Sequence, residues 1–145
     1  MRHETKPTRA ASLVPRNILA CMSEADQRAL SPSGRTPAEA RAAAVAKDER
    51  ELQRQIAAYL RLRGIWHTQS RMDRRTSNTV GTPDFVFPHA GQYVGWECKC
   101  PWSRALRPEQ EAARIAIEAQ GGQWRLITSV SEAKEHLDEL DAKTP

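Results

Sequence analysis

Three charged residues stand among apolar ones in residues 81–100, GTPDFVFPHAGQYVGWECKC. Asp84 precedes one apolar run, and Glu97 and Lys99 follow the apolar residues of the next. A charged group placed among buried side chains costs free energy unless something pairs with it. The three residues therefore need one another, a bound ion or contact with water.

Side chains alternate along a strand, so residues 96–100 divide between two faces. Glu97 and Lys99 share one face, while Trp96, Cys98 and Cys100 share the other. We expect both cysteines in the core, because no second cysteine pair is present to complete a tetrahedral zinc site. The chain has three cysteines, an odd count, and two of them are too close along one strand for a comfortable bridge. This usage favours a reducing compartment, the cytoplasm.

Two interpretations of the face that carries Glu97 and Lys99 stay open on spacing alone. One is the solvated outer face of an edge strand. The other follows from the hairpin that segments 84–87 and 92–100 are expected to form, because this hairpin would bring Asp84 close to Glu97. Two close carboxylates repel unless they share a proton or a hard cation, and a carboxylate pair with a nearby lysine suits Mg²⁺.

Periodicity and cap signals predict a series of regular elements from residue 36 onward. They are a helix from a Thr36 cap to about residue 63, a short strand in 64–71, the hairpin with a turn at 88–91, and then a helix, a strand and a helix at 107–120, 123–129 and 129–140. This order predicts an α/β domain of residues 36–145 with a mixed central sheet flanked by helices, antiparallel at the hairpin and parallel after the crossover helix. Residues 1–35 lack periodicity and are expected to form a flexible leader, and no apolar run is long enough to span a membrane.

The first predicted helix adds a further acid. Apolar residues such as Leu52 and Ile56 recur at helical spacing and form a stripe that faces the core. Glu49 falls inside this stripe, with Gln53 one turn later, whereas Glu51 points to the opposite face and is expected at the surface. Glu49 therefore either reaches water where the packed region begins or completes an acid cluster with the hairpin carboxylates.

The charge of the chain is unevenly distributed. The net charge of +4 is by itself as consistent with a solvated basic surface as with a site for a polyanion. Arginines crowd into residues 61–75, where Asp73 is the one acid. A basic block beside an irregular loop is typical of a surface that contacts phosphates. We assign contacts with DNA to three residues of this block, Arg71, Arg74 and Arg75.

The ordered set of motifs resembles the Pro-Asp…(Asp/Glu)-x-Lys nuclease superfamily, and more closely its virus-type replication-repair nuclease branch, the VRR-NUC domains. In that branch an early helix carries a Glu with a Gln one turn later. A Gly-x-Pro-Asp segment, a Glu-x-Lys strand and a helix that opens with Pro-Glu-Gln follow in this order. The resemblance covers about residues 45–140 and departs from the family at Arg107, where a small helix cap is usual, and at Cys98, where an apolar residue is common. The matching residues are Glu49, Gln53, Gly81, Pro83, Asp84, Glu97, Lys99, Pro108, Glu109 and Gln110.

The resemblance implies a restriction-endonuclease-like αβββαβ core and a DNA endonuclease that depends on Mg²⁺, with Mn²⁺ as a substitute. Asp84, Glu97 and the Cys98 carbonyl would hold the metal, and Glu49 would complete the site directly or through water. Lys99 would position the attacking water and support the developing charge, because the acids beside it favour its ammonium form. Gln53 and Gln110 are assigned to contacts with DNA. For Gln110 two alternatives stay open: it orients the helix, or it is a plain surface residue.

DNA is the expected partner, and branched DNA such as a Holliday junction would suit a homodimer that makes paired cuts. Trp66 is the apolar residue that the core of a monomer explains least, so we expect it in the dimer interface or, as the alternative, in the core. A flap or nicking nuclease and a nucleic-acid-binding module with an unused nuclease fold stay open. A hydrolase of free nucleotides is less well supported, because the sequence has no Gly-rich phosphate loop.

Overall fold

The computed structural model describes residues 16–31, 33–70 and 79–144. The three arginines to which DNA contacts were assigned, Arg71, Arg74 and Arg75, lie outside the described residues. The chain divides into two compact units, residues 1–46 and 47–145. No helix among the described residues is long and apolar enough to cross a membrane.

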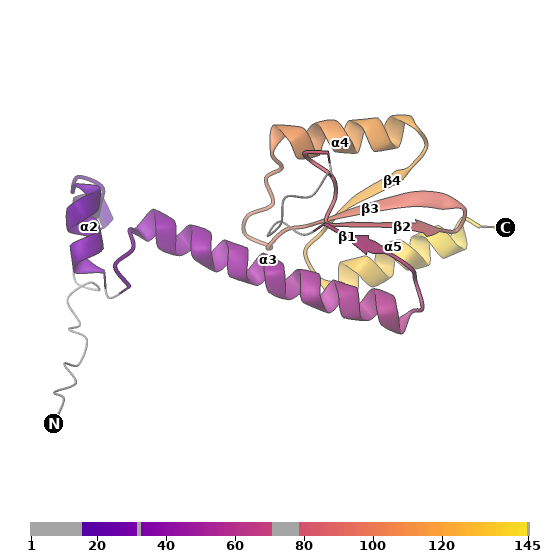
Figure 1. Cartoon of the computed structure of the whole chain (residues 1–145), viewed down its shortest axis with the longest axis horizontal. Coiled ribbons are helices and arrows are strands. Elements are labelled where there is room, and N and C mark those ends of the chain that lie inside the picture. The colour runs from indigo at the N-terminus through magenta and orange to yellow at the C-terminus, as the bar shows by residue number, and fades with distance from the viewer. Residues whose placement is uncertain (1–15, 32, 71–78, 145) are drawn as a thin grey trace, which may run out of the picture. The chain divides into compact units, whose positions relative to one another are not determined.

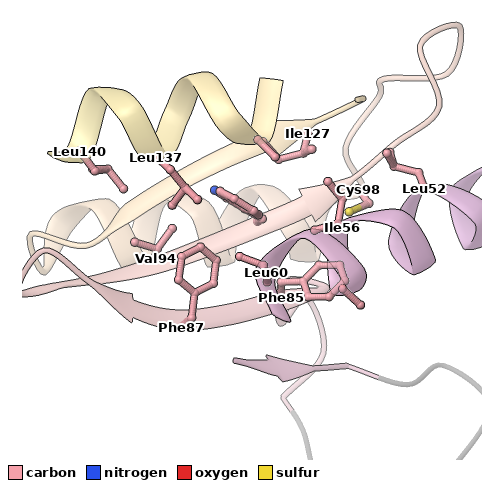
Figure 2. Packing of buried hydrophobic residues seen from close by; sticks show 13 residues of the cluster. Leu52, Ile56, Leu60, Phe85, Phe87, Val94, Cys98, Ile127, Leu137 and Leu140 are labelled. Carbon is pink, nitrogen blue, oxygen red and sulfur yellow. The ribbon is translucent and has the colours of Figure 1, made fainter. Parts of the chain in front are cut away.

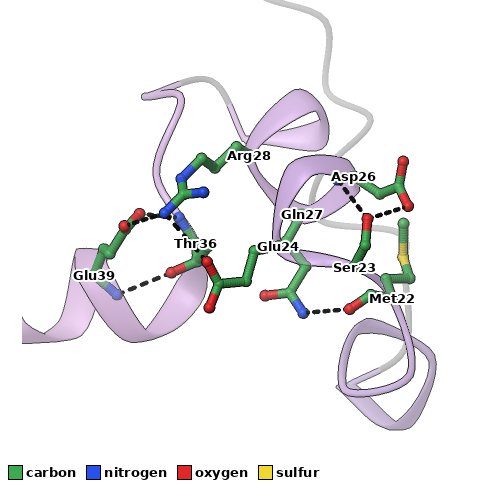
Figure 3. Close-up of polar contacts among 8 residues, drawn as sticks. All are labelled: Met22, Ser23, Glu24, Asp26, Gln27, Arg28, Thr36 and Glu39. Carbon is green, nitrogen blue, oxygen red and sulfur yellow. Dashed lines mark hydrogen bonds and ion pairs between the residues drawn. The ribbon is translucent and has the colours of Figure 1, made fainter.

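The first unit contains two short helices where the sequence predicts a flexible leader. We expected no regular structure before residue 36, but α1 (Arg16–Leu19) and α2 (Glu24–Leu30) are helical. Ser23 caps α2, since its hydroxyl oxygen accepts a hydrogen bond from the backbone N–H of Asp26 at 3.2 Å (Figure 3). Residues 1–15 of the expected leader lie outside the described residues.

The third helix, α3 (Pro37–Leu62), starts at the predicted cap. The backbone N–H of Glu39 donates to the Thr36 hydroxyl at 3.2 Å, and the N–H of Thr36 donates to the Glu39 carboxylate at 2.8 Å (Figure 3). This reciprocal pair satisfies two donors that the start of a helix leaves without an intrahelical partner. Arg28 of α2 forms an ion pair with the same carboxylate and lowers the pKa of Glu39 to about 2.

The second unit is an α/β structure built on a four-stranded sheet with strand order β1-β2-β3-β4. The strands are β1 (Thr68–Gln69), β2 (Phe85–His89), β3 (Gln92–Cys98) and β4 (Gln123–Ile127), and α4 (Pro108–Ala119) and α5 (Val130–Ala142) flank β4 in the sequence. The first three strands pair antiparallel, and β4 runs parallel to β3 after the α4 crossover. The predicted element order and the mixed sheet are therefore confirmed.

Two details of the sheet differ from the predictions. The strand expected in 64–71 reduces to the two residues of β1, at the edge of the sheet. The hairpin turn is shorter than the predicted 88–91, because β2 continues to His89, which pairs with Gln92. Only Ala90 and Gly91 remain in the turn, both with positive φ (50° and 73°), as two-residue hairpin turns of the I′ type require.

Within the second unit, residues 47–62 of α3 and helix α5 cover one face of the sheet, and α4 covers the other (Figure 1). On the first face, apolar side chains of both helices and of the three longer strands form one core (Figure 2). Its members include Leu52, Ile56, Leu60, Phe85, Phe87, Val94, Trp96, Cys98, Ile127, Leu137 and Leu140. Because alternate residues of β3 contribute to this core, the residues between them point to the face that α4 covers.

One polar contact lies inside this core. The indole N–H of Trp96 donates to Nδ1 of His136 at 2.8 Å, which satisfies a donor that would otherwise be buried without a partner. Burial lowers the pKa of His136 to about 4, so its imidazole is neutral at pH 7. The contact ties α5 to β3 directly behind the strand segment that carries Glu97.

Candidate functional site

The hairpin brings the two predicted carboxylates together at one end of β2 and β3. Phe85 pairs with Trp96, so Asp84 and Glu97 are the next residues along the same ladder. One carboxylate oxygen of Asp84, Oδ2, accepts a hydrogen bond from the backbone N–H of Cys98 at 2.8 Å. Both carboxylates are withdrawn from water, with exposed fractions of 7% for Asp84 and 4% for Glu97. The solvated-edge interpretation of this face is therefore wrong.

Burial makes the ionised form of this pair unfavourable. Burial raises the pKa of Asp84 to about 6, although the hydrogen bond from the Cys98 N–H lowers it in part. Burial also raises the pKa of Glu97 to about 8, and the charge of Asp84 is the next cause. Near neutral pH, the two carboxylates therefore hold a proton between them or require a cation.

Two residues of α3, Glu49 and Gln53, affect the pKa values of this carboxylate pair. The charge of Glu49, a half-buried residue of α3, raises the pKa of Asp84 and of Glu97. A hydrogen bond from the Gln53 side chain lowers the pKa of Asp84. Glu51 lies at the surface as expected, and its carboxylate forms an ion pair with Arg54 (2.7 Å).

Lys99 is half-buried and follows Glu97 on the same face of the chain. Its charge lowers the pKa of both Asp84 and Glu97, so the ammonium group lies close enough to offset part of the carboxylate repulsion. Its backbone N–H donates to the Ile127 carbonyl at 3.0 Å and extends the parallel ladder by one residue. The two cysteines that alternate with these residues are buried in the protein, as predicted.

Gln110 connects the start of α4 to the carboxylate pair. Its side chain is 4% exposed, which excludes the surface position, and its Nε2 donates to Oε1 of Glu97. Its Oε1 accepts from the backbone N–H of Arg107 at 2.9 Å, the residue before α4. The same amide therefore caps a helix and holds a catalytic candidate, so orientation rather than contact with DNA is the role that this geometry supports. The capping position was visible in the sequence, because Pro108 marks the first residue of the helix and Gln110 the third.

Glycines allow the motif segments to approach one another closely. Gly81 has a φ of 88°, and a Cβ atom there would lie 2.2 Å from the Glu109 carbonyl oxygen in the first turn of α4. A Cβ on Gly95 of β3 would lie 3.0 Å from the ring of Pro83. The segment before Asp84 is thus fixed between α4 and β3, and the first turn of α4 that it contacts is the turn that contains Gln110.

The donor set fits a divalent cation bound with partial hydration. Among the residues that the structure describes, no group of three or more His, Cys, Asp or Glu side chains is arranged to hold a metal ion. Nearby cations such as Lys99 offset the charge of the buried pair of Asp84 and Glu97 only in part, since the pKa values of both acids stay raised. Mg²⁺ commonly binds through one or two carboxylates with water in its other positions. The charge of Glu49 acts on both carboxylates of the pair.

Comparison of this chain with protein-family models, with curated proteins and with solved structures found no match. The interpretation of the site therefore depends on its residues and their geometry.

Proposed function

We propose that this chain is a metal-dependent DNA endonuclease with a restriction-endonuclease-like core. The observation that carries the proposal is the buried pair of Asp84 and Glu97, whose pKa values burial raises to about 6 and about 8. Such a pair lowers the stability of the metal-free fold at neutral pH. A module that only binds nucleic acid would gain nothing from it, whereas a hydrolase of phosphodiesters needs carboxylates for its metal.

The groups that would hold Mg²⁺ or Mn²⁺ are the two carboxylates and the backbone carbonyl of Cys98, with Glu49 acting through water. A divalent cation at this position supplies Lewis-acid stabilisation of the phosphate and activates water for attack. The chain itself keeps the ligands in place before the cation binds, because the Cys98 amide fixes Asp84 and the Gln110 amide fixes Glu97. Such preorganisation reduces the reorganisation needed at the moment of reaction.

Lys99 contributes a positive charge beside both carboxylates. Its ammonium group would contact a non-bridging phosphate oxygen and stabilise the negative charge that grows as the phosphodiester bond breaks. The same group would orient the attacking water by hydrogen bonding. Because these interactions strengthen in the transition state, removal of the ammonium should reduce turnover more than binding of the cation.

The direct test is incubation of the purified chain with linear, flap and four-way DNAs in Mg²⁺, Mn²⁺ or EDTA. We expect cleavage that requires the metal and disappears in Asp84→Ala and Glu97→Ala, with Glu51→Ala as a matched control at an exposed acid. Lys99→Ala should retain cation binding in calorimetry while losing most turnover. Robust cleavage by either hairpin variant, free of contaminating nuclease, would refute the site.

One observation favours a second candidate, a nucleic-acid-binding module with an unused nuclease fold. It is the lack, among the described residues, of a third side chain arranged with the carboxylate pair to hold a metal. The same DNA panel distinguishes the two candidates. Binding without cleavage in both metals, at pH values on either side of the Glu97 pKa, would favour the module.

The homodimer and the basic loop remain proposals of their own. Trp66 is 70% exposed, and Leu62 at the end of α3 is also exposed, so the two are candidates for an interface with a second copy. Sedimentation over a range of concentrations, with and without four-way DNA, tests this, and a monomer that still cuts would rule out paired cleavage by a stable dimer. Joint replacement of the three loop arginines should flatten the salt dependence of DNA binding, and an unchanged slope would assign them to a solvated surface.

A further inference from the structure

The connection from β3 to α4, residues 99–107, carries an exposed tryptophan between the two elements that contribute Glu97 and Gln110 to the candidate site. Trp102 is 64% exposed and stands three residues after Lys99. In Figure 1 this connection links the end of β3, which carries Glu97, to the start of α4, which carries Gln110. Neither the carboxylate chemistry nor the core explains an indole at this position.

The backbone holds this tryptophan in a defined turn. Cys100 is buried, Pro101 has a fixed φ, and the N–H of Ser103 donates to the Cys100 carbonyl at 3.0 Å. These contacts close a four-residue turn in which Trp102 occupies the third position. The turn therefore presents the indole from a buried anchor, and a ligand that stacks on it has little backbone freedom to remove.

The charge of the same connection is uniformly positive. Residues 99–107, KCPWSRALR, contain Lys99, Arg104 and Arg107 and no acid. The charge of Arg107 lowers the pKa of Glu97, so its guanidinium lies near the candidate site. Arg104 forms a 3.7 Å ion pair with Glu132 between two solvent-accessible side chains, a weak contact that a phosphate can replace.

An exposed aromatic ring flanked by cations is the combination that binds single-stranded nucleic acid, because bases stack on the ring while phosphates meet the cations. In a paired duplex each base is already stacked between its neighbours, so an indole gains a stacking partner only where a strand is unpaired. Trp102 stands five residues after Glu97, on a fixed turn between the strand that carries Glu97 and the helix that carries Gln110, so a base stacked on it would lie near the phosphate to be cut.

We infer that residues 99–107 bind an unpaired DNA strand beside the cleavage position, with Trp102 stacked on one base and Arg107 in contact with an adjacent phosphate. The inference rests on the proposed function for its choice of DNA, and it narrows the substrate class. The preferred substrate carries a single-stranded segment at the cut, as in a flap or a gapped duplex, rather than a fully paired duplex.

The test measures binding of short single-stranded and duplex oligonucleotides in EDTA, where no cleavage occurs, by fluorescence anisotropy. Trp102→Ala should weaken binding of the single strand by about 5- to 150-fold, the range of one lost base–aromatic stack, and leave duplex binding unchanged. Trp102→Phe should retain most of the affinity. Tyr93→Ala is the matched control, because Tyr93 is also an exposed aromatic residue but stands four residues before Glu97 on β3, about 13 Å along the strand, near the hairpin turn.

A scan of abasic nucleotides locates the stacked base. In the wild-type protein one abasic position should cost as much affinity as Trp102→Ala, and this position should have no effect in the Trp102→Ala background. Equal binding by the Trp102→Ala and Tyr93→Ala proteins, or an equal loss for single strand and duplex, would overturn the inference. If the protein cuts no DNA but Trp102→Ala still selectively loses single-strand binding, the endonuclease proposal fails while this inference stands.

Discussion

Replacement of Asp84 by asparagine should stabilise the metal-free protein while removing its response to Mg²⁺. The amide keeps the size of the side chain and an oxygen that accepts from the Cys98 N–H. Burial raises the pKa of Asp84 to about 6, whereas an exposed aspartate titrates near about 3.9. At about 1.4 kcal/mol per pKa unit, the ionised carboxylate costs the folded chain about 3 kcal/mol at pH 8. The new amide group needs a partner of its own, so we expect a net gain of about 1 to 3 kcal/mol in the free energy of unfolding.

The stability that Asp84→Asn gains over the wild type should increase with pH, because the pKa of Asp84 is raised in the folded chain. An acid whose pKa is higher in the folded chain binds more protons when folded, so stability falls as pH rises between the unfolded and the folded value. For Asp84 this interval runs from about pH 4 to about pH 6, and the advantage of Asp84→Asn at pH 5 should be about half of that at pH 8. Glu97 adds to the gain at pH 8, because its pKa falls when the charge of Asp84 is removed. His136, whose lowered pKa acts with the opposite sign below pH 6.5, cancels in the comparison of the two proteins.

Urea denaturation at pH 8 and pH 5, first in EDTA and then in Mg²⁺, checks both parts of this prediction. The wild-type protein should gain about 1.4 kcal/mol when Mg²⁺ is present at ten times its dissociation constant, and Asp84→Asn should gain little. Asp138→Asn serves as the control, because this exposed carboxylate forms an ion pair with Lys134 at 2.6 Å and should lose a little stability. An Asp84→Asn protein that is less stable than the wild type at pH 8 in EDTA would show that the carboxylate pair is not strained.

Three further substitutions test how the site is held together. Gln110→Ala should lose about 2 to 4 kcal/mol of stability in chemical denaturation and also weaken Mg²⁺ binding in calorimetry, because a charge-assisted hydrogen bond and a helix cap are lost together; Gln55→Ala, whose amide donates to an exposed glutamate at 3.1 Å, should change neither. Gly81→Ala should cost several kcal/mol, on the order of 3 or more, in thermal melts, since its Cβ would overlap the backbone of α4; Gly64→Ala, where φ is also positive but no atom lies within 4 Å, should cost only about 1 kcal/mol. Glu49→Gln should slow plasmid cleavage by orders of magnitude without loss of stability, and an unchanged rate would remove Glu49 from the site.

The features that could be predicted from the sequence depend on residues a few positions apart. The cap of α3 follows from Thr36 and Glu39, whose reciprocal hydrogen bonds need only one helical turn. The separation of Glu97 from Trp96 and Cys98 follows from the two-residue period of a strand. The proximity of Asp84 to Glu97 follows from the hairpin, because a short connection allows only a narrow range of registers.

The features that could not be predicted depend on how the elements dock. The hydrogen bond from Gln110 to Glu97 exists because α4 lies against the segment that begins at Gly81, and no local pattern encodes this contact. Helices α1 and α2, with 4 and 7 residues, are shorter than the window in which helical periodicity can be recognised. Strand β1 contains only Thr68 and Gln69, because only these residues pair with β2. The composition of residues 64–71 does not show where this pairing ends, so the predicted strand was too long.

The cost of the site and its proposed chemistry have the same physical origin. A carboxylate pair that water solvates freely would ionise without strain and would have little preference for a divalent cation over solvent. Burial on the face of the sheet that α4 covers, with fixed hydrogen bonds from Cys98 and Gln110, removes that solvation and leaves the pair in need of positive charge. Binding of the cation would then relieve a destabilisation that folding has already imposed. The stability that the metal-free Asp84→Asn protein gains over the wild type therefore measures how much of the wild-type affinity for the cation comes from relief of this strain.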